Sequence, residues 1–150
     1  ENVSAIIQNK LPQKCKDPGM FTIPCVIGNT KIEHTMLDLG ASINVMPHSM
    51  YASLKLGPLK QTGIIIQLAD RSNVYPEGII EDVLVKINNL IFSADFYILY
   101  MEDDASLNPN PILLGRPFLK TAKTKIDVDK GILTMEFDGE TTEFDVFKEN

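Results

Sequence analysis

One carboxylate in this sequence stands where it can do chemistry. Asp38 ends an apolar run at residues 36–37, and Gly40 follows two residues later. Burying an ionised carboxylate is costly unless it is hydrogen-bonded or paired, so an Asp at the corner between a strand and a turn is a candidate functional group. Gly40 lets the backbone turn sharply, and Ser42 can hydrogen-bond to the local backbone. A structural Asp that caps a turn is the alternative these residues leave open.

The other residue types that support hydrolysis or metal binding are isolated. The two histidines, His34 and His48, and the two cysteines, Cys15 and Cys25, lack the spacing of a zinc site, and no serine forms a recognisable triad. We expect no metal and no cofactor. Two cysteines are too few for a disulfide scaffold, so we expect free thiols, although a disulfide between them stays open. The acidic run at 102–104 is expected to be a solvated loop, with cation binding as the weaker alternative.

Composition and charge limit the class of protein. The chain has 150 residues, enough for one domain with its own core, and is 44% hydrophobic and 23% charged, as is usual for globular proteins. The net charge is −6 and the lysines are scattered, which argues against nucleic acid as a partner, because phosphate binding needs basic clusters. No apolar run approaches the roughly 20 residues of a membrane span. We expect no membrane association and a cytoplasmic location.

Short apolar stretches separated by tight turns predict an all-β barrel or sandwich with two short helices. Two-residue turns are expected at residues 28–29, 88–89 and 138–139. The predicted strands cover residues 21–27, 30–37, 63–69, 79–87, 90–99, 111–116, 125–128, 132–137 and 141–147, and the predicted helices cover residues 47–56 and 117–123.

Two further segments bear on domain organisation. Residues 63–87 are interpreted as one long hairpin with a polar, mobile tip. Residues 1–19 are polar and end in a turn signature, so we expect an arm or linker there and a single domain over residues 20–150. Because the chain does not begin with Met, this arm is interpreted as part of a longer polyprotein.

Two distant motifs resemble those of the retropepsin family of aspartic proteases. Residues 37–42, Leu-Asp-Leu-Gly-Ala-Ser, are similar to the family's Asp-Thr/Ser-Gly-Ala/Ser motif, and residues 112–116, Ile-Leu-Leu-Gly-Arg, to its distal motif. The family has a flap hairpin between these motifs, where residues 63–87 lie. The resemblance covers residues 21–147 and is closest to plant Ty3/Gypsy-type retrotransposon proteases, as the residues at 67–72 and 114–119 indicate.

The resemblance implies a single-lobed, all-β retropepsin-like barrel that acts as an aspartic endopeptidase in polyprotein processing. In such an enzyme two carboxylates share a proton: one takes a proton from water while the other protonates the peptide carbonyl. This chain has one such motif, so the resemblance implies a homodimer in which each copy contributes Asp38.

The resemblance also implies a role for each matched residue, with Asp38 as the catalytic carboxylate. The substrate-binding residues are expected in the active-site loop and the flap tip: Gly40, Ala41, Ser42, Asp70, Arg71, Ser72, Asn73, Val74 and Tyr75. The residues expected to support the site are Leu39, Leu113, Leu114 and Gly115.

Leu39 departs from the family pattern, which has Thr or Ser there. The family's hydroxyl hydrogen-bonds across the dimer and Leu lacks it, so we expect a weak dimer that Leu39→Thr would tighten. The main alternative is a catalytically silent retropepsin-like module for dimerisation or peptide binding. An unrelated small β-barrel that binds peptide or ligand is the third interpretation.

Overall fold

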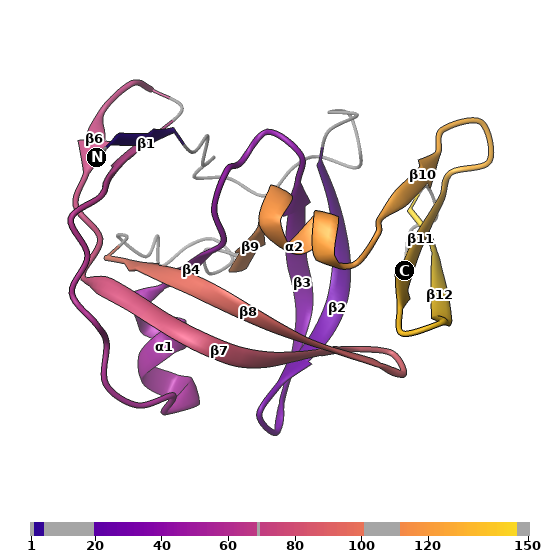
Figure 1. The fold of residues 1–150 in the computed structure, drawn as a ribbon, viewed down its shortest axis with the longest axis horizontal. Helices are drawn as coiled ribbons and strands as arrows, with labels where there is room; N and C mark the ends of the chain where they lie inside the picture. The colour runs from indigo at the N-terminus through magenta and orange to yellow at the C-terminus, as the bar shows by residue number, and fades with distance from the viewer. Residues whose placement is uncertain (1, 5–19, 69, 101–111, 147–150) are drawn as a thin grey trace, which may run out of the picture.

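The computed structural model of the chain describes residues 2–4, 20–68, 70–100 and 112–146, and a closed barrel of six strands forms its centre (Figure 1). Around the barrel the strand order is β2-β3-β9-β4-β8-β7. The barrel strands are β2 (Met20–Ile27), β3 (Thr30–Asp38), β4 (Val45–Pro47), β7 (Gly78–Ile87), β8 (Leu90–Leu99) and β9 (Ile112–Leu114).

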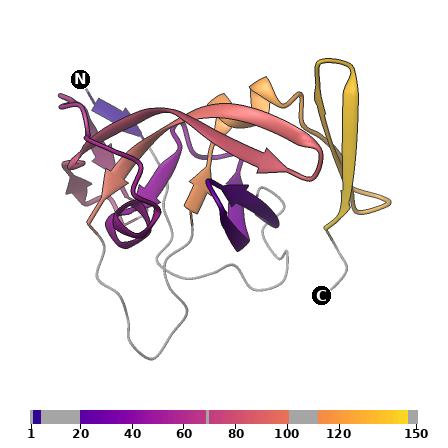
Figure 2. The same cartoon turned by 90° about the horizontal axis from the view of Figure 1, so that it is seen from below.

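Two three-stranded sheets lie at opposite ends of the barrel (Figures 1 and 2). One consists of β1 (Asn2–Ser4), β5 (Ile65–Gln67) and β6 (Asn73–Val74), and the other of β10 (Lys125–Asp127), β11 (Ile132–Phe137) and β12 (Glu140–Asp145). The two helices are α1 (His48–Leu54) and α2 (Arg116–Thr121). The prediction of an all-β barrel with two short helices is confirmed.

Tight turns and alternating side chains build the barrel, as the sequence indicates. Gly28 adopts a φ of 61°, which suits the turn between β2 and β3. In β7, Val83, Val85 and Ile87 alternate with exposed residues and enter the main core. The partner strand β8 contributes buried side chains with the same period of two, so the β7–β8 hairpin covers one side of the core.

The prediction of one long hairpin over residues 63–87 is wrong. β5 pairs with β6 in a short hairpin, whereas β7 pairs with β8 and β2. Pro76 lies between β6 and β7, and proline cannot donate to a strand ladder. The alternating apolar residues of β7 are buried in the barrel, and the hairpin turn at 88–89 places β8 beside them. Residues 63–87 therefore divide between the β5–β6 hairpin, which we name the flap, and the barrel.

The structure also differs from the sequence prediction near the N-terminus and around the first helix. Within the predicted arm, Asn2–Ser4 forms a strand that pairs in parallel with β5. Residues 45–47 form β4, a strand that the sequence did not predict. Pro47 is the N-cap of α1 rather than its first residue, and Lys55, in the left-handed region at φ 53°, ends the helix before Gly57.

The core has a main cluster inside the barrel and a smaller one beneath the β5–β6 hairpin. The smaller cluster, which we name the loop cluster, contains Met36, Ala41, Ile43, Val45, Ile66, Leu99 and Leu113. Ala41 and Ile43 belong to the loop at 39–44, and the other members come from β3, β4, β5, β8 and β9, so this loop is anchored by apolar packing.

Among the described residues, Cys25 is a buried free thiol. Its Sγ lies 3.0 Å from Oγ1 of Thr35, and burial raises the thiol pKa above its usual value.

Cys15 and the acidic run at 102–104 lie outside the described residues. In the part of the chain that the structure describes, three or more His, Cys, Asp or Glu side chains do not gather at any point. No helix of this part is long and apolar enough to span a membrane.

Candidate active site

Asp38 is the last residue of β3 and lies almost completely inside the protein, with 4% of its surface exposed. Its strand is held on both sides, by antiparallel β2 and parallel β9. The backbone N–H of Gly40 donates a hydrogen bond to Oδ1 of Asp38 over 2.8 Å. A Cβ at position 40 would lie 3.2 Å from this oxygen, so glycine allows the loop to close on the carboxylate. This bond satisfies a buried acceptor and orients the side chain.

Gly115, which follows β9, supports the loop at 39–44 from behind, and we name this segment the active-site loop because it follows the candidate residue Asp38. A Cβ at this position would lie 2.7 Å from the carbonyl oxygen of Ala41 and would also clash with the carbonyl oxygen of Ile43. The next residue, Arg116, donates its backbone N–H to the Ala41 carbonyl over 2.9 Å. Close contact between two backbone segments thus fixes the loop that follows Asp38.

Asn44 is a site-supporting residue that sequence reasoning missed. It is 5% exposed, and its Oδ1 accepts a hydrogen bond from the Gly115 N–H over 2.8 Å. Its Nδ2 donates to the Asp95 carbonyl over 3.0 Å, and its own carbonyl accepts from the Tyr97 N–H over 3.0 Å. The side chain therefore ties the loop to β8 and to Gly115. A polar residue inside the apolar run at 43–46 was the available signal, since buried amides need partners.

The four predicted support residues have different surroundings. Leu113 and Leu114 are buried and lie beside Met36 and Leu37 in the parallel β3–β9 register. Gly115 follows them against the loop. Leu39 is instead 42% exposed, so its side chain does not pack behind the loop.

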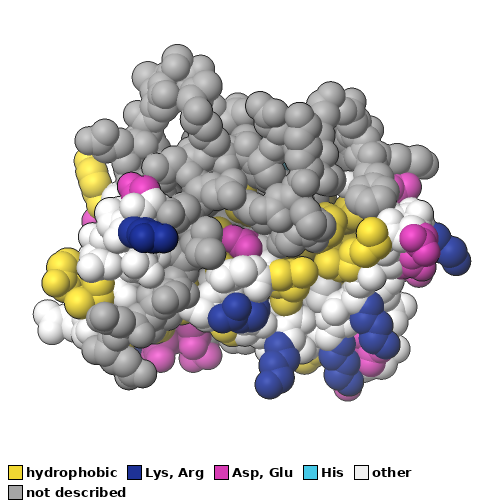
Figure 3. Space-filling view, turned by 90° about the horizontal axis from the view of Figure 1, so that it is seen from above, with side chains coloured by type: hydrophobic (Ala, Val, Ile, Leu, Met, Phe, Trp, Pro, Cys, Tyr) yellow, Lys and Arg dark blue, Asp and Glu magenta, His cyan; other side chains and the backbone are white. Residues whose placement is uncertain are grey.

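A groove with a volume of about 750 Å³ lies beside Leu39. Its described lining consists of apolar, hydroxyl and basic side chains: Leu39, Ser42, Arg116, Pro117, Leu119, Lys120, Thr124 and Ile126. Figure 3 shows hydrophobic side chains gathered at the centre and right of the face seen from above, with Lys and Arg side chains below them and some Asp and Glu side chains nearby. The groove beside the loop that follows Asp38 therefore offers apolar surface together with the basic side chains of Arg116 and Lys120.

The β5–β6 hairpin places the predicted flap residues over the loop cluster. Ile66 of β5 is fully buried there, and Val74, its register partner in β6, packs against the same cluster. Ala41 is also fully buried in this cluster. The hairpin and the active-site loop thus share one apolar contact region.

The flap tip is polar and is held by local hydrogen bonds. Oδ1 of Asp70 accepts hydrogen bonds from the Ser72 hydroxyl at 2.5 Å and the Ser72 N–H at 2.9 Å. The hydroxyl bond and then the backbone bond hold the pKa of Asp70 below its usual value. Arg71 has a φ of 71°, and Tyr75 is 73% exposed. These side chains lie on the surface.

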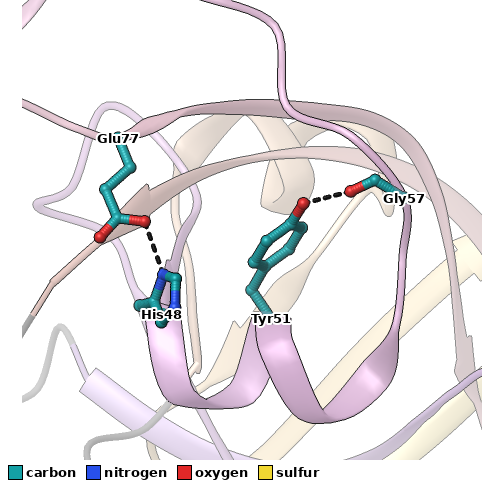
Figure 4. A network of polar contacts seen from close by, with 4 residues as sticks. All are labelled: His48, Tyr51, Gly57 and Glu77. Carbon is teal, nitrogen blue, oxygen red and sulfur yellow. Dashed lines mark hydrogen bonds and ion pairs between the residues drawn. The ribbon is translucent and has the colours of Figure 1, made fainter.

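Polar contacts also fix α1 beside the base of the flap (Figure 4). Nδ1 of His48 lies 2.5 Å from Oε2 of Glu77, and the Tyr51 hydroxyl donates to the Gly57 carbonyl. The Glu77 N–H donates to the Ile98 carbonyl over 2.8 Å. The segment that leads from the flap into β7 is therefore attached to both α1 and β8.

The fold matches a solved retroviral protease-like domain. The crystal structure of the retroviral protease-like domain of Ddi1 from Leishmania major superimposes with a TM-score of 0.56 and 20% sequence identity, covering 78% of this chain and 85% of that chain. No family model and no curated protein match the sequence. The fold is thus an all-β, retropepsin-like barrel. Identity of 20% establishes the fold alone.

Proposed function

We propose that the chain is an aspartic endopeptidase that acts as a homodimer, with Asp38 of each copy at the shared active site. The observation that carries this proposal is the Asp38 carboxylate, buried at the end of a barrel strand and oriented by the Gly40 N–H in a retropepsin-like fold. A buried carboxylate in such a loop is a typical functional group.

The proposed reaction uses the two Asp38 side chains as one acid–base pair. Two carboxylates held close together do not both ionise readily, so they share a proton. The ionised carboxylate takes a proton from water, and the resulting hydroxide attacks the peptide carbonyl carbon, while the protonated partner donates its proton to the carbonyl oxygen. The carboxyl that took the proton from water then gives it to the amide nitrogen, and the C–N bond breaks. A hydroxyl of the intermediate returns its proton to the other carboxylate, so that the amine and the new carboxylic acid leave and the pair regains its shared proton. The Gly40 N–H stabilises the ionised form.

The proposed substrate is an extended peptide held between the active-site loop and the flap. Gly40, Ala41 and Ser42 would contact it from the loop, and residues 70–75 from the flap. Ala41 is fully buried, so its contribution would come from the backbone. The resemblance of residues 67–72 and 114–119 to plant Ty3/Gypsy-type proteases supports a retrotransposon polyprotein as the natural substrate, processed in the cytoplasm.

Asp38→Asn tests this function. The substitution is nearly isosteric and keeps the oxygen that accepts from Gly40, but it removes the proton-sharing carboxylate. We expect an unchanged fold and the loss of peptide cleavage, measured at about pH 5, just above the usual carboxyl pKa. Asp138→Asn is the matched control, because Asp138 lies in a hairpin turn with a φ of 53°, which Asn tolerates. Hydrolysis by Asp38→Asn at the parent rate would refute the assignment.

A second function, peptide binding or dimerisation without catalysis, is favoured by one observation. Leu39 stands where the resembled family has a hydroxyl, and its side chain is exposed beside an apolar groove. The two functions are separated by one comparison on the parent chain. If the parent forms a dimer and binds peptide but cleaves none of it, the non-catalytic function is the correct one.

A further inference from the structure

The flap strand β5 carries a segment of the chain's own N-terminal region on its edge. β1 pairs in parallel with β5, in the register Asn2 to Ile65, Val3 to Ile66 and Ser4 to Gln67. The strand order in this sheet is β1-β5-β6 (Figure 1). β5 is therefore the central strand of this sheet, with β6 on one edge and β1 on the opposite edge.

This edge belongs to the part of the flap that lies on the active-site loop. Ile66, the register partner of Val3, is fully buried in the loop cluster with Ala41 and Ile43. These two residues follow Asp38 by three and five positions in the sequence. The β1 strand is thus attached to the same small assembly of hairpin and loop that forms the candidate active site.

The backbone of a strand edge pairs with extended segments largely without regard to their side chains. An extended peptide that joins the flap sheet at β5 must therefore use the edge that β1 holds. We propose that β1 is an autoinhibitory strand, which occupies the peptide-pairing edge of β5 and has to leave before another extended peptide can pair there. This inference rests on the proposed peptide substrate, but the competition itself does not need catalysis.

The tether sets the strength of this inhibition. β1 is joined to β2 through residues 5–19, and a segment on a short tether competes at an effective concentration in the millimolar range. A strand that pairs through only three residues binds weakly, and we place its dissociation constant at about one half to one tenth of this effective concentration, so that β1 holds the edge most of the time. We therefore expect β1 to weaken peptide binding by about three- to tenfold rather than to abolish it.

Two proline variants of the full chain, Val3→Pro and Ser4→Pro, test this proposal. Backbone N–H groups of successive strand residues point to opposite sides, and β1 has β5 as its one neighbour in the described sheet. One of the two prolines therefore removes a hydrogen bond to β5, and the other removes an N–H that faces away from it. Proline is tolerated on an edge strand in the second case alone. The variant whose proline faces away from β5 is therefore the control for any effect of proline other than loss of the β1–β5 hydrogen bond.

The readout is binding of a labelled synthetic peptide with the sequence of residues 1–8, measured by fluorescence anisotropy. Every protein in the comparison carries Asp38→Asn, so that the probe is not cleaved. We expect one proline variant to bind the probe about three- to tenfold more tightly than the parent, and the other to bind like the parent. Equal affinity of all three proteins, or weaker binding by a proline variant, would overturn the proposal, because β1 would then be absent from the edge or would support the flap.

Cleavage assays with Asp38 restored separate this inference from the proposed function. We expect the variant that releases β1 to lower KM for a peptide substrate by the same factor while kcat stays constant. If every variant is inactive but the binding difference remains, the proposed catalysis fails and the autoinhibitory strand stands. If cleavage occurs and the binding difference is absent, catalysis stands and the inference fails.

Discussion

Asp38 is held in the site by a loop that two glycines allow to pack closely. Gly40 brings a backbone N–H within 2.8 Å of the carboxylate, and Gly115 allows a second backbone segment to lie against the loop. Asn44 completes the support by accepting from Gly115 and donating to Asp95. Each of these contacts depends on a small side chain or a short polar one, so the loop tolerates little change in volume.

Gly115→Ala is expected to destabilise the protein by about 3 kcal/mol, because the added methyl group meets the carbonyl oxygens of Ala41 and Ile43 and the backbone has to move. The measurement is the free energy of unfolding in denaturant. Gly63→Ala is the matched control: a Cβ there would have no heavy atom within 4 Å, so we expect a change below about 1 kcal/mol. A loss of less than about 0.5 kcal/mol at Gly115 would contradict this account of the loop.

The flap and the barrel strands differ in how firmly their backbones are held. β5 and β6 share two register pairs, whereas β7 pairs along most of its length with β8 and at one end with β2. The flap tip buries little apolar surface, while alternate side chains of β7 lie in the main core. Segments with few buried contacts open locally at low free energy, and motion of such a segment can admit substrate.

We expect a sharp change in amide hydrogen exchange within residues 63–87. Amides at 70–73 should exchange at least about a hundredfold faster than those at 83–87, because the tip opens locally and the barrel opens with global unfolding. The turn at 88–89 is the control for solvent exposure, because it is exposed but joins two barrel strands. Its amides should exchange more slowly than those at 70–73. Equal protection at the flap tip and in β7 would show that the hairpin is not a separate opening unit.

At the scale of the whole molecule, the groove beside Leu39 changes the expectation for dimer stability. Burying a Leu side chain completely is worth about 1.5–3 kcal/mol. Leu39 is 42% exposed, so about 0.6–1.3 kcal/mol per copy remains for an interface. A hydroxyl contributes about 0.5–1.5 kcal/mol, but needs a matching partner in the other copy. Leu needs an apolar surface alone, and Leu119 and Ile126 line the groove.

The exposed apolar surface of Leu39 argues for the opposite effect of Leu39→Thr from the one that the missing hydroxyl suggests, and both stay predictions. We expect this substitution to raise the dissociation constant of the proposed homodimer by about three- to tenfold, since each copy would lose apolar contact. Sedimentation equilibrium measures the effect. Leu39→Ala is the control, because it removes the same apolar surface without adding a hydroxyl and should weaken the dimer at least as much. If the Leu39→Thr variant forms a tighter dimer than the parent, the apolar contact of Leu39 is the weaker effect and the missing hydroxyl limits dimer stability.

The sequence by itself determined the features that depend on neighbours along the chain. Alternating apolar residues and two-residue turns predicted the β2–β3, β7–β8 and β11–β12 hairpins, because side-chain period and turn geometry are local properties. The position of Asp38 two residues before Gly40 likewise pointed to a carboxylate at a strand end.

Tertiary structure alone decided which strand edges meet. Four features depend on segments far apart in the sequence. They are the parallel pairing of β3 with β9, the pairing of β7 with β8 rather than with the flap, the hydrogen bond between Asn44 and Gly115, and the pairing of β1 with β5. A strand has two edges and two faces, and its pattern shows which face is buried but not which partner covers each edge. Which partner covers each strand edge follows from the packing of the whole molecule. The pairing of β1 with β5 and of β4 with β8 and β9 could therefore not be predicted from the sequence.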